Sequence, residues 1–323
     1  MPWGGPGMSR FPPPSGAGAS GGAPPKIPFA KPWLNWSDQV KTLASRGLVI
    51  ADLGAAESFL SHVNYYRFSG YCVPFEQARH VFAPGTTFED VRATYDFDFT
   101  LRDLITEAAE LVEVDARTAV AYHFGQHYGA FGHTDPTRFD TGFGHHKWLD
   151  KLRYQATQSN EQFVTHFKHT YQEYPDLPVW MVTEVMSFGS LSLMYKGMLR
   201  NDQAAIANRY GLHSTVLQSW LHHLVYIRNT CAHHARLWDR RWQIRPTAPR
   251  HAAWAVVQQP HNDTLFATLL LLRYMLARCP SIAPFDAEWK ARVEAHLAKP
   301  PPVANPLVRM GLTPTWTAHP LWA

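Results

Sequence analysis

The strongest constraint on the fold is a long helical pattern that runs from Phe97 to Phe124. Apolar residues recur in it at intervals of three and four, and charged residues occupy the opposite positions. The apolar positions are Leu101, Leu104, Ile105, Ala108, Leu111, Val112, Ala119 and Tyr122. This spacing puts the apolar side chains on one face of a helix and the charged side chains on the other. We therefore predict one long amphipathic helix.

Shorter helical patterns cover most of the remaining chain. They span residues 37–48 with Ser37 as the cap, 55–66, 148–155, 161–171, 178–198 with Pro178 in the first turn and a bend at Gly189, 203–210, 215–233 and 285–298; a further helix reaches Ala277 from a cap at Asn262 or Asp263. Residues 71–87 and 125–146 are predicted to be irregular, although residues 71–75 allow a short extended piece. The sequence has no alternating strand pattern and no internal repeat. We predict an all-α fold.

Composition indicates the domain organisation and the cellular location of the protein. Residues 1–30 are rich in Gly, Pro and Ser, so we expect a disordered tail followed by one helical domain over residues 31–323. The longest apolar run, around Leu269–Leu272, stops at Arg273, well short of the roughly 18 residues of a membrane-spanning helix. The first 20 residues lack the apolar stretch of a secretory signal, and the three cysteines lie far apart. We expect a cytoplasmic protein without a membrane segment.

Charge and histidine content leave several chemistries open. The formal net charge is +4, which is compatible with a polyanionic partner without demanding one. The 18 histidines allow proton transfer, metal binding or simply a polar surface. Cys231, His233, His234, His145 and His146 invite a zinc site, but no pair of ligand motifs supports it. We therefore predict no metal and no cofactor.

The most informative stretch is Leu217–Arg241, which reads LQSWLHHLVYIRNTCAHHARLWDRR. Its apolar stripe consists of Leu217, Trp220, Leu221, Leu224 and Val225, and a step of about 100° per residue puts Arg228 near the middle of that stripe. An arginine cannot lose its proton in a protein, so on an apolar face it needs a carboxylate, a carbonyl or a bound anion. A buried Asp or Glu and a phosphate remain equally good partners at this point.

The residues that follow favour chemistry on a phosphodiester. Arg228, Asn229 and His233 supply a guanidinium, an amide and an imidazole within roughly one and a half helical turns. The imidazole can move a proton, and the guanidinium can stabilise developing negative charge. Residues five apart point about 140° from each other on an ideal helix. Either the helix is distorted there or two copies of the chain share one site.

Four blocks of the sequence carry a family resemblance. They are VNYYRFSGY at 63–71, LPVWMVTEVMSFGSLSLMY at 177–195, RNTCAHHARLWDR at 228–240 and MGLTPTWTAHPLW at 310–322. Arg228 and His233 form an R-x4-H motif with a polar residue after the arginine, as in the HEPN superfamily of α-helical ribonucleases. The blocks together resemble the Abi-like abortive-infection proteins of the AbiD/AbiF type, over most of the chain from about Lys31 onward.

The resemblance implies a HEPN-like helical bundle with extra helices and an anti-phage, toxin-like ribonuclease activity. In that superfamily two protomers pair their R-x4-H motifs into one composite site, usually without metal ions. Arg228, Asn229 and His233 match the functional positions. The implied reaction is attack of the RNA 2′-hydroxyl on the adjacent phosphorus, which DNA cannot support because it lacks this nucleophile. The implied partners are RNA, a second copy of the chain and a regulatory noncoding RNA or antitoxin.

Neighbouring side chains are candidates for supporting roles. His234, Arg236, Arg240 and Arg241 can hold RNA phosphates, or they are a solvated helix end. Tyr65, Tyr66 and Arg67 suit unpaired bases, although aromatic residues at helical spacing more often belong to a core. Glu184 is a candidate partner for Arg228.

Two other functions fit the same sequence. The first is a non-catalytic RNA-binding or RNA-sensing protein of the same fold, and the second is a protein-interaction module without RNA affinity. The first alternative predicts RNA binding without a product, and the second predicts no RNA binding.

Overall fold

The computed structural model describes residues 28–250, 254, 260–279 and 283–323. Residues 36–323 form one compact unit. The described residues before it, 28–35, contain no helix or strand. The predicted disordered tail at 1–30 lies almost entirely outside the described residues, so it stays a prediction.

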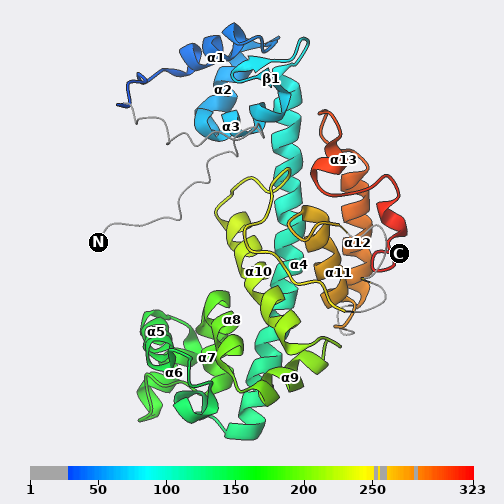
Figure 1. The fold of residues 1–323 in the computed structure, drawn as a ribbon. Coiled ribbons are helices and arrows are strands. Elements are labelled where there is room, and N and C mark those ends of the chain that lie inside the picture. Colours follow the sequence, from blue (N-terminus) through cyan, green and yellow to red (C-terminus); the bar gives the residue numbers. More distant parts are fainter. Residues whose placement is uncertain (1–27, 251–253, 255–259, 280–282) are drawn as a thin grey trace, which may run out of the picture. The chain divides into compact units, whose positions relative to one another are not determined.

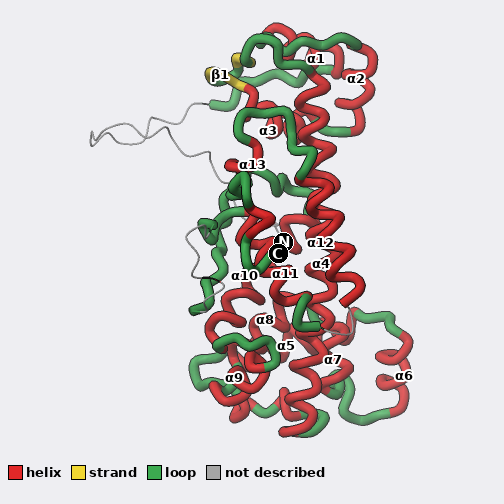
Figure 2. The backbone as a smooth tube through the Cα atoms, turned by 90° about the vertical axis from the view of Figure 1, so that its right-hand side faces the viewer, coloured by secondary structure: helices red, strands yellow, loops and turns green. Residues whose placement is uncertain are grey.

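The regular structure of the described compact unit is almost entirely α-helical, which confirms the predicted fold class (Figures 1 and 2). Its helices are α1 (Trp36–Ser45), α2 (Leu53–His62), α3 (Tyr65–Cys72), α4 (Phe88–Tyr128), α5 (His145–Gln158), α6 (Gln162–Thr170), α7 (Val179–Val185), α8 (Phe188–Gly197), α9 (Arg200–Asn208), α10 (Ser214–Ala232), α11 (Leu265–Leu276), α12 (Ala283–Leu297) and α13 (Pro306–Arg309). Two short strands, β1 (Glu76–Ala78) and β2 (Val81–Phe82), pair antiparallel between α3 and α4.

The long helix α4 is the element against which α3, α7, α10, α11 and α12 all pack (Figure 1). It begins nine residues earlier than predicted because Thr87 and Asp90 form a capping box at its start. It ends after Tyr128, where Gly129 takes a positive φ of 72°. Most of the predicted stripe is buried.

Three residues of α4 depart from the predicted pattern. Tyr122 is 72% exposed, and Val120 and Phe124, which the stripe did not include, are buried in this part of the helix. Asp98 and Arg102 are buried, although the pattern assigns charged residues to the exposed face. They pair with each other through a 2.6 Å contact, which makes their burial possible.

Local caps divide two helices that the periodicity joins. The predicted helix over 55–66 stops at His62, and Asn64 starts α3 by accepting a hydrogen bond from the Tyr66 amide. The predicted helix over 178–198 breaks at Met186, and the Ser187 side chain caps α8. Each capping side chain satisfies a backbone N–H that has no partner inside the helix.

The region predicted to be irregular between residues 71 and 87 is partly regular. Tyr71 and Cys72 complete α3, and residues 73–75 form a 3-10 turn rather than an extended piece. The two short strands follow at 76–78 and 81–82. They are too short for an alternating pattern to reveal them.

Helix α10 carries the R-x4-H motif and lies against α4, α8 and α9. Its buried side includes Trp220, Leu224 and Ile227. Helix α11 is buried along nearly its whole length. Among the described residues, no helix combines the length and the apolar character that a bilayer crossing requires.

Candidate functional site

The site lies at the carboxyl end of α10, where the helix closes in a defined turn. The amide of His234 donates to the Cys231 carbonyl at 2.8 Å, and the amide of Ala235 donates to the Thr230 carbonyl at 3.0 Å. This pair of bonds is a Schellman motif, and His234 occupies its left-handed position with a φ of 53°. Glycine usually takes that position. The turn leaves the His233 side chain exposed just beyond the last helical residue.

The guanidinium of Arg228 turns toward α4. Its Nη2 lies 3.4 Å from Oε2 of Glu113, and the Arg228 side chain is 32% exposed. The other oxygen of Glu113 pairs with Arg117, whose guanidinium also donates to the backbone carbonyls of Thr183 and Met186. One carboxylate thus holds two arginines at the junction of α4, α10 and the end of α7.

Glu113 replaces the partner that the sequence suggested for Arg228. Glu184 is exposed on α7, beside Tyr154 and Gln158, and it makes no hydrogen bond to Arg228. The end of α7 does lie near the motif, but its contacts there are the Thr183 and Met186 carbonyls, which accept hydrogen bonds from Arg117. The prediction of Glu184 as the partner is therefore wrong.

Arg228 and His233 do not contact each other within the described chain. Helix α10 is regular as far as Ala232, so no distortion brings the two side chains together. Asn229 and His233 are both exposed, while Arg228 faces α4. Of the two possibilities that helix geometry left open, a distorted helix is excluded.

A buried network fixes the chain immediately after the motif. The carboxylate of Asp98 accepts hydrogen bonds from the Trp238 amide at 2.7 Å, the Leu237 amide at 3.1 Å, the Tyr71 hydroxyl at 2.6 Å and the Arg102 guanidinium at 2.6 Å. Burial and the adjacent Asp98 carboxylate raise the pKa of the Tyr71 hydroxyl, so it stays a donor. Through these bonds Asp98 anchors to α4 the chain segment that follows His233.

Two arginines join α3 to the same turn. Arg67 donates to the backbone carbonyl of His234, and Arg236 donates to the backbone carbonyl of Gly70. Arg240 donates to the Arg236 carbonyl and lies 5.7 Å from the ring centroid of Tyr226. These bonds hold the three guanidinium groups in place, which a freely solvated helix end would not do.

The charges of these three arginines are not neutralised by carboxylates of the described residues, since all their bonds go to backbone oxygens or a ring. Arg241 differs, because it pairs with Asp263 at 3.2 Å. Tyr66, the residue before Arg67, is 70% exposed. The structure thus brings Arg67, His234, Arg236 and Arg240 together around the end of α10, and Tyr66 is next to Arg67 on α3.

The cysteine and histidine candidates for zinc have other environments. Cys231 is buried, and burial raises the pKa of its thiol to about 12, so it stays protonated. His145 is buried with Nε2 2.9 Å from the His133 carbonyl oxygen, whereas His146 is exposed and pairs with Asp150. In the described parts of the chain, no three potential ligands gather as a metal site would need.

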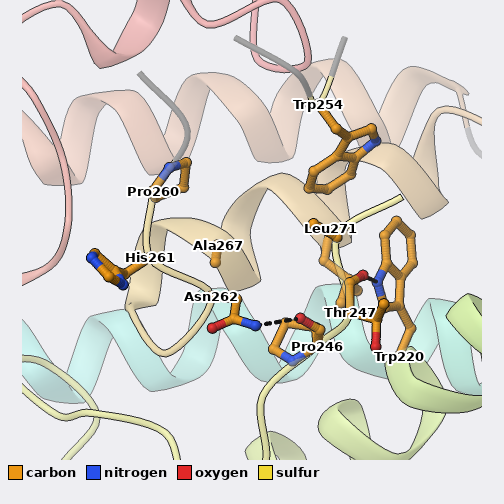
Figure 3. Close-up of a pocket in the computed structure, with 10 residues that line it drawn as sticks. Trp220, Pro246, Thr247, Trp254, Pro260, His261, Asn262, Ala267 and Leu271 are labelled. Carbon is orange, nitrogen blue, oxygen red and sulfur yellow. Dashed lines mark hydrogen bonds between the residues drawn. The ribbon is translucent and has the colours of Figure 1, made fainter. Parts of the chain in front are cut away.

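A pocket of about 270 Å³ opens elsewhere, between α10, α11 and the chain that follows Pro246 (Figure 3). Its described lining is mainly apolar and includes Trp220, Trp254 and Leu271. Asn262 closes one side by donating to the Pro246 carbonyl. None of the predicted site residues lines this pocket.

Comparison with known proteins places this arrangement in a family. A family model described as Abi-like protein matches residues 58–239, more than half of the chain. The chain belongs to the Abi-like protein family. The matched region of the Abi-like chain includes α4, α7, α8 and α10, and it ends just after the Asp98-anchored turn. No curated protein and no solved structure matches the chain.

The match confirms the Abi-like resemblance that the sequence blocks indicated. Sequence reasoning missed Glu113, Arg117 and Asp98, which hold the motif in place. Their only signal is a spacing of four residues, Glu113 to Arg117 and Asp98 to Arg102, which is also typical of surface ion pairs.

Proposed function

We propose that this Abi-like chain is a metal-independent HEPN-type endoribonuclease that acts in abortive infection in the cytoplasm. The family membership supports the role in abortive infection. The single observation that carries the activity is the end of α10, where a carboxylate-held Arg228 and an exposed His233 flank an exposed Asn229. These groups supply charge stabilisation and proton transfer, the two requirements for cleaving RNA without a metal ion.

The proposed reaction uses the 2′-hydroxyl of RNA as the nucleophile. A His233 imidazole accepts the proton of the 2′-hydroxyl while its oxygen attacks the adjacent phosphorus. The bond from phosphorus to the 5′-oxygen breaks, and a protonated imidazole returns a proton to that oxygen. The products are a 2′,3′-cyclic phosphate and a 5′-hydroxyl. Arg228 stabilises the extra negative charge on the phosphorane oxygens, and Asn229 orients the phosphate.

Two copies of the chain complete this site. Arg228 and His233 of one chain face in different directions on a regular helix. A two-fold axis near the end of α10 would put the arginine of one copy beside the histidine of the other. A dimer also supplies two imidazoles, one to accept and one to donate a proton.

The cations around the turn are proposed to hold the RNA backbone. The hydrogen bonds of Arg67, Arg236 and Arg240 go to backbone carbonyls and not to carboxylates of the described residues. Each guanidinium also has N–H groups beyond those already bonded. His234 and Tyr66 lie at the same end of α10 or on the linked helix α3. We also propose that a noncoding RNA or antitoxin restrains the activity.

The test is cleavage of end-labelled single-stranded RNA by the purified full chain in EDTA. The parent protein is compared with Arg228→Ala, His233→Ala and the matched control His169→Ala, which removes an exposed histidine from α6. We expect cyclic phosphate ends from the parent and the control, and losses of roughly 10²- to 10⁴-fold in rate for the two motif variants. Motif variants that cleave as fast as the parent would refute the proposal.

One observation favours a second function, a non-catalytic RNA-binding protein. In this structure Glu113 already holds Arg228, away from His233. On this alternative the parent binds RNA in a salt-dependent way without forming product. His233→Ala then changes neither affinity nor product. The same assay, with binding measured alongside, separates the two functions.

A further inference from the structure

The proposed reaction places Arg228 at the RNA phosphate, whereas this structure pairs it with Glu113. The Glu113 side chain is only 13% exposed, so its carboxylate is largely withdrawn from water. A buried carboxylate that loses its last cationic partner is strongly disfavoured. In a site with only these two groups, Arg228 would stay on Glu113 and bind a phosphate poorly.

Glu113 has a second partner, which is held more firmly than Arg228. Arg117 lies one turn further along α4 and pairs with the other carboxylate oxygen. Its guanidinium also donates to the carbonyls of Thr183 and Met186, and its side chain is 11% exposed, against 32% for Arg228. Within the described chain, Arg228 is tied to this carboxylate by a single contact of 3.4 Å. Arg117 is thus the fixed partner, and Arg228 is the partner that can leave.

The three side chains together carry an excess of positive charge. Two guanidinium groups share one carboxylate, and neither arginine pairs with any other carboxylate of the described residues. Arginine stays protonated in proteins, so this excess is permanent. When Arg228 turns to an anion, Glu113 keeps the charge of Arg117 beside it. No buried carboxylate is then left without a cation.

We propose that Arg117 is a positioning residue of the RNA site: it keeps Glu113 neutralised, so that Arg228 can exchange the carboxylate for an RNA phosphate. This inference rests on the proposed function and concerns the regulation of the same site. Without the charge of Arg117, Arg228 is the one cation left for Glu113 and stays on it. A purely structural Arg117 would instead only tie α4 to the end of α7 through the two carbonyls.

The test measures RNA binding by the full chain carrying His233→Ala, the reference chain, so that the RNA is not consumed. The probe is a labelled single-stranded oligoadenylate. Arg117→Gln keeps an amide that can donate to a carbonyl but loses the charge, and we expect it to weaken binding about tenfold, the equivalent of about 1.4 kcal/mol. Adding Glu113→Gln restores the net charge of the reference chain and frees Arg228, so we expect binding within about twofold of the reference.

Two controls separate this role from a structural role and from the loss of one charge. Arg153→Gln removes an arginine that ties α5 to Asp176, and we expect binding within about twofold of the reference chain. On an Arg228→Gln background, Arg117→Gln is expected to cause no further loss, because the arginine through which it acts is already absent. A purely structural Arg117 would lower binding on either background, and Glu113→Gln would not restore it.

Thermal unfolding of each variant shows whether it is folded. If Arg117→Gln does not fold, Arg117→Lys and Glu113→Gln decide the question. The lysine keeps a cation beside the carboxylate, and Glu113→Gln removes the carboxylate, so neither is expected to weaken binding by more than about twofold. Normal binding by Arg117→Gln, a loss that Glu113→Gln does not restore, a tenfold loss in either of the other two variants, or a reference chain that does not bind the strand would each overturn the proposal.

Cleavage by chains that keep His233 separates this inference from the nuclease. If the motif variants lose cleavage and Arg117→Gln binds RNA like the reference chain, only the role of Arg117 fails. If Arg117→Gln loses binding, Glu113→Gln restores it and the parent chain never cleaves RNA, the nuclease fails and the role of Arg117 in RNA binding stands.

Discussion

Replacing the buried Asp98 by asparagine tests whether the motif turn depends on one carboxylate. Asparagine keeps the shape but loses the charge, and its amide nitrogen is a donor where the carboxylate accepts. Arg102, whose side chain is 5% exposed, would keep its charge without a carboxylate. Removing one partner of a buried ion pair costs about 3–5 kcal/mol. We therefore expect Asp98→Asn to lower the free energy of unfolding by about 4 kcal/mol.

That loss is large against the roughly 5–15 kcal/mol of a typical domain, so it is measurable by urea unfolding. Trp238 is fully buried beside Asp98, so tryptophan fluorescence follows the transition. Asp96→Asn is the matched control on the same helix. Its carboxylate is 60% exposed and lies 3.8 Å from Arg92, so we expect a change below about 1 kcal/mol. An Asp98→Asn protein within 1 kcal/mol of the parent would refute the anchoring role.

Two further predictions concern the turn and the pH dependence of stability. His234 has a left-handed backbone with a φ of 53°, which glycine adopts without strain, so His234→Gly is expected to raise the free energy of unfolding by about 1 kcal/mol. Urea unfolding measures this change, and a variant less stable than the parent would show that the backbone at His234 is not strained. Burial lowers the pKa of both His133 and His223 to about 4, below the unfolded value of about 6.5, so below pH 6.5 the unfolded chain binds protons that the folded chain excludes. The free energy of unfolding is therefore highest above about pH 6.5 and falls toward pH 4, with a loss of about 2 kcal/mol per histidine at pH 5. The measurement is urea unfolding at pH 7.5 and at pH 5. Equal free energies of unfolding at the two pH values would contradict the prediction.

Hydrophobic periodicity was sufficient to predict most of the helices, although not the short α13, and it did not predict their ends. The α4 stripe is an average over many residues, so single exceptions such as Asp98 do not hide it. A helix boundary depends on one or two capping side chains. Thr87, Asn64 and Ser187 each decide a boundary, and all three residue types are common in sequences without capping anything.

In the site, too, local features were predictable from the sequence, whereas contacts between distant segments were not. The placement of Arg228 on an apolar stripe correctly required an acceptor, and that acceptor is Glu113. The identity of the acceptor was not predictable, because 115 residues separate the pair and only the packing of α10 on α4 brings them together. Glu184 was the nearer candidate in sequence, but its helix exposes that side chain.

The relation between Arg228 and His233 follows from both levels. Helix geometry alone gives a divergence of about 140° between residues five apart, provided that the helix continues. The structure meets this condition, because α10 is regular as far as Ala232 and the Schellman turn follows at His233. The Asp98 network then holds Leu237 and Trp238, the chain just beyond the turn, against α4. Because Arg228 pairs with Glu113 and His233 lies beyond the end of the helix, we propose that a reaction needing both groups takes one of them from a second copy of the chain.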